Sequence, residues 1–151
     1  MLYCCVTGHR DIPTDKENEV KQRLYDEILQ AIHDGYDVFI SGFADGADLL
    51  FAEIVAQLRE QYPKLFMEAA IPYRNRLKST STRFQHLLRE CNGVKIVCER
   101  YQPDCFLLSN RYMVNQSSRV IAVYDGREKG GTFSTMRYAY CLNREVRIIH
   151  I

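Results

Sequence analysis

Two glycine-bearing loops contain the residues of this chain that are best placed to do chemistry. The first loop, residues 41–48 (SGFADGAD), follows the apolar run at 38–40, and the second, residues 130–132 (GGT), follows the apolar run at 120–124. Each loop stands where a strand should give way to a helix. A helix that begins at a glycine turn presents unpaired backbone N–H groups and the positive end of its dipole, so it can hold a phosphate or another anion. The two loops therefore predict a site for a nucleotide-like ligand.

A third loop of this kind consists of Thr7, Gly8, His9 and Arg10, which follow the nearly continuous apolar run at residues 2–7. An imidazole and a guanidinium together can hold a phosphate or polarise a ribose oxygen. The alternative is a tight turn, in which His9 bonds to the backbone and Arg10 lies in solvent. The position at the carboxyl end of a strand favours the binding role.

Within residues 41–48, the glycines and the aspartates suggest different roles. Gly42 and Gly46 allow a ligand to approach the backbone closely. Asp45 and Asp48 stand at the start of the next helix, where aspartates commonly act as N-caps. We therefore expect both aspartates to be structural, and we expect Ser41 and the amides near Gly46 to contact the ligand.

The last glycine loop begins at Asp125 and continues to Gly130, Gly131 and Thr132, with Thr135 one helical turn later. Its hydroxyl and N–H groups could form a phosphate cradle. A lone Gly-Gly-Thr is a weak motif, and its weight comes from the pairing with the other two loops. The sequence has neither GxGxxG nor GxxxxGK[ST], so it carries neither the ordinary NAD fingerprint nor a P-loop.

Two further polar segments could reach the same site. Arg111 lies on a predicted helix next to a strand end, and we expect it to contact the ligand; Asn110 and Asn115 on this helix could also face the cleft. Residues 74–78 are basic and follow Tyr73, so they could stack a base or hold a phosphate. The alternative for such a charged loop is simple solvation.

The elements that must position these loops alternate along the chain. Strands are expected at residues 2–7, 37–40, 65–71, 93–98, 119–124 and 146–151. The first helix is expected between a capping box at Thr14 and a stop at Gly35, and later helices carry apolar residues around 50–58, 84–91, 104–118 and 131–140. This alternation implies right-handed crossovers and predicts an α/β, three-layer Rossmann-like fold with a mostly parallel sheet of about six strands.

In sheets of this kind, ligands bind beyond the carboxyl ends of the strands, near the point where the strand order reverses. The loops that should surround the site are residues 7–11, 41–48, 72–76, 99–101 and 125–135.

Length and composition limit the class of protein. With 151 residues and 46% hydrophobic content, residues 1–151 are expected to form a single domain. Twenty basic and nineteen acidic side chains give a formal charge of +1, which argues against a general nucleic-acid binder and leaves a local basic patch possible.

The six cysteines form no CxxC pair, and no signal-like segment precedes the first strand, so we expect a cytoplasmic protein with reduced thiols. Cys91, Cys98 and Cys105 fall on three different predicted elements, which disfavours a shared metal site and favours buried apolar roles. No apolar run approaches the ~20 residues of a membrane span.

In this order and at these strand ends, the TGHR, SGFADGAD and GGT motifs resemble the SLOG superfamily. This group includes the YpsA-like proteins, the LOG-type nucleoside-monophosphate phosphoribohydrolases and the Rossmann-like domain of the DNA-processing protein DprA. The resemblance covers nearly the whole chain and is closest to the YpsA-like branch, where a TGxR-type start, an SGxxxGxD loop and a late glycine-threonine turn recur. It implies a nucleotide or nucleotide-derived ligand between Gly8, His9 and Arg10 on one side and residues 130–132 on the other.

The resemblance also defines two alternatives. LOG-type enzymes carry a PGGxGTxxE signature whose glutamate serves cleavage of the N-glycosidic bond, whereas here Met136 or a near neighbour falls at that position. Glu99 or Asp125 would have to replace the glutamate as catalytic carboxylate. The DprA family has an arginine before the loop glycine where this chain has Asp45, and that charge reversal argues against strong DNA binding.

The sequence thus favours binding of a nucleotide-like small molecule, by a sensor or a cryptic enzyme. The alternatives are a LOG-type N-glycosidase and a single-stranded nucleic-acid module. No metal site or cofactor other than this nucleotide-like ligand is identified, and a homo-oligomer is compatible with the sequence.

Overall fold

The computed structural model describes all residues, 1–151, and shows one six-stranded sheet. The strands are β1 (Tyr3–Gly8), β2 (Val38–Ser41), β3 (Phe66–Tyr73), β4 (Gly93–Cys98), β5 (Arg119–Tyr124) and β6 (Glu145–His150). Their order is β4-β3-β2-β1-β5-β6, and every neighbouring pair is parallel. The predicted α/β fold class is therefore confirmed.

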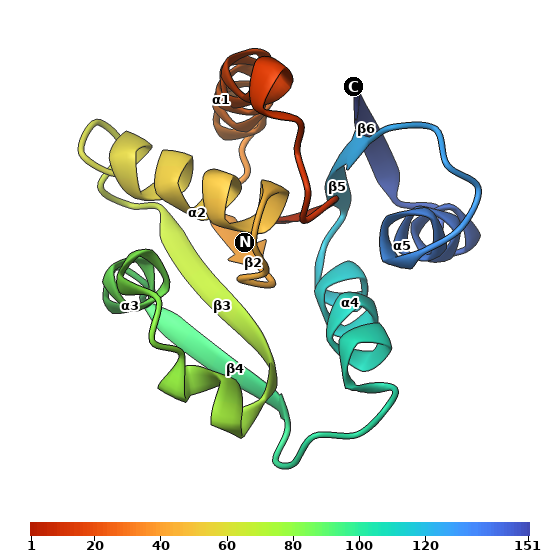
Figure 1. Cartoon of the computed structure of the whole chain (residues 1–151). Coiled ribbons are helices and arrows are strands. Elements are labelled where there is room, and N and C mark those ends of the chain that lie inside the picture. Colours follow the sequence, from red (N-terminus) through yellow and green to blue (C-terminus); the bar gives the residue numbers. More distant parts are fainter.

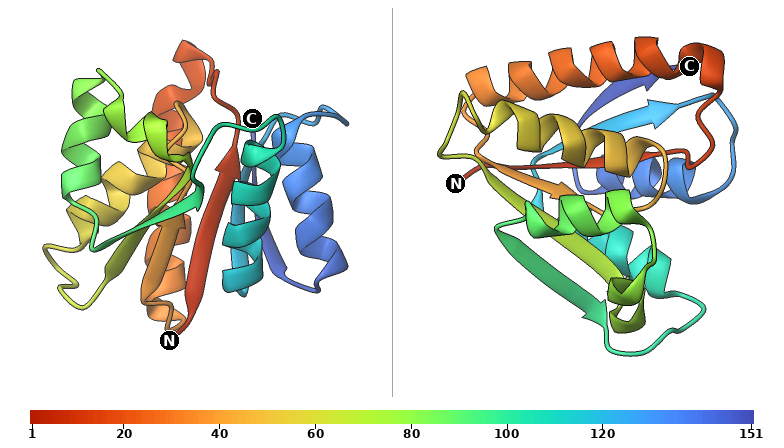
Figure 2. Two further views of the ribbon diagram at one scale, coloured as in Figure 1. Left: turned by 90° about the horizontal axis from the view of Figure 1, so that it is seen from below. Right: turned by 60° about the vertical axis from the view of Figure 1, so that its left-hand side comes forward.

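Helices cover both faces of the sheet (Figure 1; Figure 2, left). On one face lie α1 (Glu17–His33), α2 (Ala47–Leu58) and α3 (Thr82–Arg89), and on the other lie α4 (Cys105–Gln116) and α5 (Gly131–Cys141). Two 3-10 helices, η1 (Thr14–Lys16) and η2 (Arg74–Lys78), precede α1 and α3. No helix is both long and apolar enough to cross a membrane.

The core is divided by the sheet. A cluster of 26 buried residues fills the space between the sheet and α1, α2 and α3, and a cluster of eight packs under α4 and α5. The nearly continuous apolar strands suit this double coverage, because a strand buried on both faces has no solvent-facing side. Residues 120–123 of β5 illustrate it, since all four are fully buried.

Two of the predicted helix N-terminal caps do not form in the structure. The expected capping box at Thr14 does not form, because the chain enters α1 through η1, and the N-cap residue, Lys16, makes no side-chain capping hydrogen bond. Asp104 holds the N-cap position of α4, but its side chain accepts no capping hydrogen bond either. Of the three cysteines expected to be buried, Cys98 and Cys105 are buried and Cys91 is only partly buried. Cys4 and Cys5 are also buried, whereas Cys141 is exposed.

The strand order reverses between β1 and β5, since β2 to β4 extend the sheet to one side of β1 and β5 and β6 extend it to the other. The loops that follow β1 and β5 must diverge at this point and leave a crevice between them.

Candidate functional site

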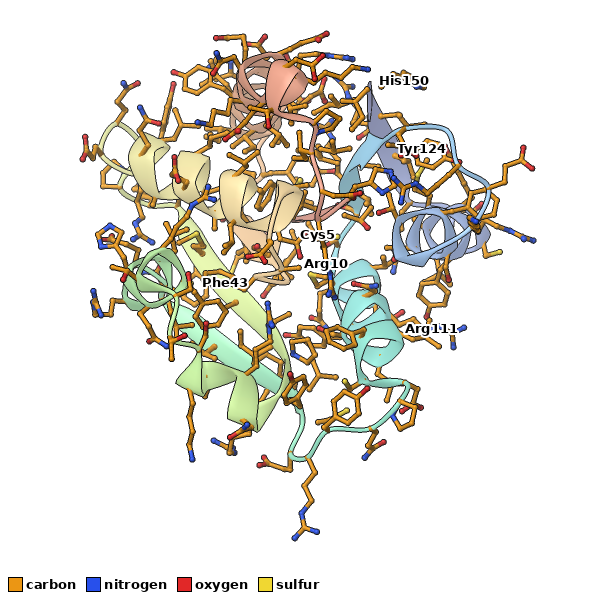
Figure 3. All side chains as sticks on the ribbon, in the orientation of Figure 1. Cys5, Arg10, Phe43, Arg111, Tyr124 and His150 are labelled. Atoms are coloured by element: carbon orange, nitrogen blue, oxygen red, sulfur yellow. The ribbon has the colours of Figure 1, made fainter.

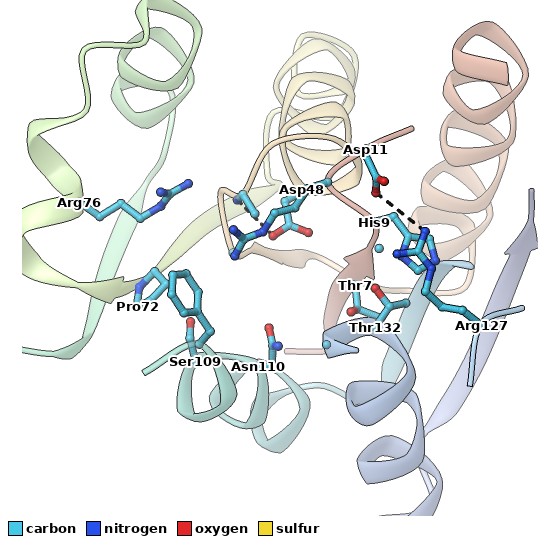
Figure 4. Close-up of a pocket in the computed structure, with 16 residues that line it drawn as sticks. Thr7, His9, Asp11, Asp48, Pro72, Arg76, Ser109, Asn110, Arg127 and Thr132 are labelled. Carbon is cyan, nitrogen blue, oxygen red and sulfur yellow. Dashed lines mark hydrogen bonds and ion pairs between the residues drawn. The ribbon is translucent and has the colours of Figure 1, made fainter. Parts of the chain in front are cut away.

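A cavity of about 500 Å³ lies at this crevice, beyond the carboxyl ends of β1, β2, β3 and β5 (Figure 4). It is bordered by Thr7, Gly8, His9, Arg10, Asp11, Gly42, Ala44, Asp48, Pro72, Arg76, Phe106, Ser109, Asn110, Arg127, Gly131 and Thr132. Only two of the sixteen are hydrophobic. The volume suits a small molecule, and the polar lining suits one that carries charge or many hydrogen-bonding groups.

Two glycines bring the first two loops together behind the cavity. A Cβ atom on Gly8 would lie 2.3 Å from Cβ of Ala47, at the start of α2. Gly46 has a φ of 77°, and a Cβ there would lie 2.3 Å from the carbonyl oxygen of His9. The backbone after β1 therefore rests directly on the N-terminus of α2, which is possible only without side chains at these two positions.

The N-terminus of α5 opens into the cavity. Gly131 and Thr132 are its first two residues, and the N–H groups of Gly131, Thr132 and Phe133 have no hydrogen-bond acceptor within the protein. No side chain caps this end of the helix. Three free N–H groups and the positive end of the helix dipole are together able to hold an anion without any charged side chain.

Three arginines surround the cavity, and each is held by a second group. The guanidinium of Arg10 lies 4.9 Å from the centre of the Phe106 ring. Arg76 lies 5.6 Å from the Phe84 ring and donates from Nη2 to the carbonyl of Phe43 at 3.1 Å, while its buried Nε has no partner. Arg127 binds the carboxylate of Asp125, with 2.8 Å between Nε and Oδ2. The cavity therefore has an excess of positive charge in fixed positions.

His9 connects the loop after β1 to the loop after β5. Its side chain is buried and its ring stacks on Tyr124, with 6.1 Å between the ring centres. The backbone N–H and Oδ1 of Asp125 both lie 3.1 Å from Nε2. Burial lowers the pKa of His9, so the imidazole is neutral at pH 7 and Nε2 accepts the bond from the N–H. His9 thus holds the start of the loop after β5 against the loop after β1, at the border of the cavity.

Asp48 places a carboxylate in the cavity wall. Its side chain is only 9% exposed, and Oδ2 accepts a hydrogen bond from the N–H of Ala44 at 3.2 Å. A Cβ on Gly42 would lie 2.8 Å from the same oxygen, so the glycine makes room for the carboxylate. Burial raises the pKa of Asp48 to about 7, against the opposing effects of the Ala44 N–H, Arg10 and Arg76.

Seven of the twelve residues that the sequence nominated for ligand binding line the cavity, namely Thr7, Gly8, His9, Arg10, Gly42, Gly131 and Thr132. They come from three loops that are distant in sequence, and the parallel sheet brings them to one edge. Their part in binding a ligand remains a prediction.

Three other nominated residues lie outside the cavity. Ser41 is fully buried, where its hydroxyl donates to the carbonyl of Asp48 at 2.8 Å and accepts from the N–H of Phe43. Gly46 faces the carbonyls of the preceding loop. Arg111 points away from the cavity on the far side of α4, with its guanidinium 5.0 Å from the centre of the Tyr138 ring (Figure 3).

Gly130, Asp125 and Glu99 also do not border the cavity. Gly130 is exposed and, with a φ of 92°, forms the N-cap turn of α5. Asp125 binds the guanidinium of Arg127, which does border the cavity, and this contact lowers the pKa of Asp125 to about 2. Glu99 is an exposed partner of Arg74, with 2.6 Å between Oε2 and Nε. Neither carboxylate occupies the position of a catalytic group in the cavity.

Asp48 and Arg76 are the functional candidates that the sequence reasoning did not nominate. Asp48 was expected to cap α2, but Gly46 holds the N-cap position and Asp48 is the second residue of the helix. Arg76 belongs to the basic stretch at residues 74–78, for which the sequence left both phosphate binding and simple solvation open. Its guanidinium lies 5.6 Å from the centre of the Phe84 ring, a contact between residues of two elements that the sequence alone does not show.

Similar proteins are known for most of this chain. A YpsA family model, described as the YspA SLOG family, matches residues 4–147. A UPF0398 protein of Bacillus cereus is 28% identical over 118 residues, which are 74% of this chain and 64% of that protein. A UPF0398 protein of Bacillus pumilus is 27% identical over 144 residues, 86% of this chain and 77% of that protein. The chain thus spans less than two thirds of the Bacillus cereus relative.

Two solved structures share the fold. DNA processing protein A from Helicobacter pylori, whose single-stranded DNA binding mode that structure addresses, superposes with a TM-score of 0.69 and 22% identity, over 97% of this chain and 64% of that one. The structural-genomics target TM1055 superposes with a TM-score of 0.60 and 17% identity, over 97% and 72% of the two chains. At these identities the likeness concerns the fold alone.

Proposed function

The chain belongs to the YpsA family of SLOG proteins, and from that premise we propose that it binds a nucleotide or nucleotide-derived small molecule, as a sensor or a cryptic enzyme. The observation that carries the proposal is the open N-terminus of α5 in a polar cavity that also holds three arginines. The phosphate of the ligand would bind the free N–H groups of Gly131 and Thr132. Arg10 would bind a second polar or anionic group of the same molecule.

We propose binding rather than LOG-type hydrolysis, because α5 supplies no carboxylate. Its sequence, GTFSTMRYAYC, has no acidic residue, and Met136 is buried at only 4% exposure. A carboxylate at that position would face the core rather than a ligand. Glu99 cannot substitute for it, since it lies outside the cavity in an ion pair with Arg74.

A thermal-shift screen with AMP, ADP, NAD and ADP-ribose tests the proposal. A ligand at 100 times its dissociation constant adds about 2.7 kcal/mol of apparent stability. In calorimetric titration, Arg10→Ala should weaken the binding of a nucleotide identified in the screen by ~10- to 100-fold, because a charge-assisted hydrogen bond contributes about 1.5–3 kcal/mol. Arg111→Ala is the matched control, since it also removes an arginine–aromatic contact but lies outside the cavity. Equal losses in both variants would contradict the assignment of Arg10.

Single-stranded DNA binding is the second candidate, favoured by the fold shared with DNA processing protein A. The three arginines of the cavity surround one hollow of about 500 Å³, Asp48 lines the same hollow, and the exposed Asp45 adds negative charge to the loop at residues 41–48. We expect oligonucleotides to bind near the non-specific range of ~10⁻⁴ to 10⁻⁶ M at physiological salt. Fluorescence anisotropy across a salt series measures this affinity. Submicromolar, length-dependent binding that is lost in an Arg74→Ala, Arg76→Ala double variant would favour the DNA-binding function instead.

A further inference from the structure

The carboxylate of Asp48 has a free oxygen inside the cavity. Oδ2 accepts the Ala44 N–H, whereas Oδ1 makes no hydrogen bond within the protein, and neither oxygen forms an ion pair with an arginine. The side chain is nine-tenths buried, so the cavity is the only space from which a partner can reach Oδ1. A carboxylate oxygen that is open to a cavity and has no partner within the protein can accept hydrogen bonds from a ligand that donates them.

The position of Asp48 determines which part of a nucleotide could supply those donors. Figure 4 shows Asp48 between Arg76, at one end of the cavity, and Thr132, at the other. A phosphate against Asp48 would place like charges together, which is unfavourable, whereas the free N–H groups at Thr132 attract a phosphate. A neutral group with O–H donors suits the carboxylate, and in a nucleotide that group is the ribose, one sugar away from the phosphate.

We infer that Asp48 accepts hydrogen bonds from the ribose hydroxyl groups of the ligand, so that the cavity selects ribonucleotides over 2′-deoxyribonucleotides. Carboxylates perform this recognition in other nucleotide sites, where an acidic side chain binds the ribose 2′-OH. The inference rests on the proposed function, since it names the substrate class of the same cavity. It also separates this chain from a DNA-binding module, whose ligand lacks the 2′-OH.

Binding should also release protons. Burial raises the pKa of Asp48 to about 7, so the group is partly protonated in the free protein at that pH. Two hydroxyl donors stabilise the ionised form and lower this pKa, while Arg10 and Arg76 act in the same direction. A ribonucleotide should therefore displace up to about half a proton at pH 7. A deoxyribonucleotide should displace less.

The test is calorimetric titration of AMP, 2′-deoxy-AMP, ADP and 2′-deoxy-ADP, each in two buffers of different ionisation enthalpy. We expect at least tenfold weaker binding of the deoxy forms, a ratio reduced to about two or three in Asp48→Asn, with the proton release lost. Asp45→Asn is the matched control, because Asp45 is exposed in the same loop and does not border the cavity. It should keep the full ratio.

The outcomes distinguish the two proposals. Equal binding of ribo and deoxy forms by the unmodified protein would overturn the role of Asp48 and leave the proposed function in place. If none of these four nucleotides binds, and neither NAD nor ADP-ribose binds in the thermal-shift screen, the proposed function is overturned as well. The comparison in the unmodified protein needs no substitution, so it stays informative even if Asp48→Asn fails to fold.

Discussion

Replacing Asp48 with Asn should raise the free energy of unfolding by on the order of 4 kcal/mol at pH 8 and change it little near pH 4. The folded-state pKa of about 7 lies above the value of 3.8 for the unfolded chain. Between these values the folded protein keeps a proton that the unfolded chain has lost, so stability falls as pH rises through this window. Asn carries no charge at any pH, and it can still accept the hydrogen bond from Ala44.

The measurement is urea unfolding of both proteins at intervals from pH 4 to pH 8. Asp125, whose pKa of about 2 reflects its bonds to Arg127, stabilises the fold throughout this range in both proteins, so its contribution cancels in the difference. Asp45→Asn, on the solvent side of the same loop, should follow the unmodified protein at every pH. Parallel curves for Asp48→Asn and the unmodified protein would show that Asp48 is ionised without cost.

The fold could be predicted from sequence because its signals are local. Each strand is a short apolar run, each is followed by a glycine or polar loop, and the alternation itself requires parallel crossovers. Family membership followed from the order of three loop motifs rather than from any one of them. The errors concern boundaries, as at Thr14, where a 3-10 turn replaces a cap because the competing geometries differ little in energy.

The candidate site was less predictable from the sequence, because packing between elements that are distant in sequence determines which residues face the cavity. Arg111 and Asn110 are neighbours in sequence, but one residue on a helix is a rotation of about 100°. Asn110 therefore borders the cavity while Arg111 lies over Tyr138 on the outside. The sequence places both on one helix, and only the contact of α4 with the sheet determines which of them faces the crevice.

The protonation state of Asp48 could not be predicted from the sequence either. An aspartate near a helix start is equally typical of an exposed N-cap and of a buried ligand contact. The loop after β1 approaches the start of α2 closely, which Gly46 permits. This contact is not local in sequence, so neither the burial of Asp48 nor its raised pKa could be predicted from residues 41–48 alone.

Replacing Gly131 with Asp should abolish nucleotide binding and leave the fold intact. A Cβ atom at this position would meet only Nδ2 of Asn110, at 3.9 Å, so there is room for a side chain. An aspartate in the first turn interacts favourably with the helix dipole and should add about 0.3–1 kcal/mol of stability. Its charge would occupy the proposed phosphate site, where repulsion between unit charges 4 Å apart is roughly 4 kcal/mol, several hundredfold in affinity.

Gly131→Ala separates the effect of charge from that of bulk, since it adds the same Cβ atom without a carboxylate. We expect the alanine variant to bind within a few-fold of the unmodified protein in calorimetric titration with a nucleotide identified by the thermal-shift screen. Gly131→Asp is expected to raise stability and to lower nucleotide affinity. A general loss of structure would lower both, so the two measurements together distinguish the two explanations. If Gly131→Asp unfolds at a higher denaturant concentration and still binds the nucleotide normally, the N-terminus of α5 is not the phosphate site, and the proposed orientation of the ligand must be abandoned.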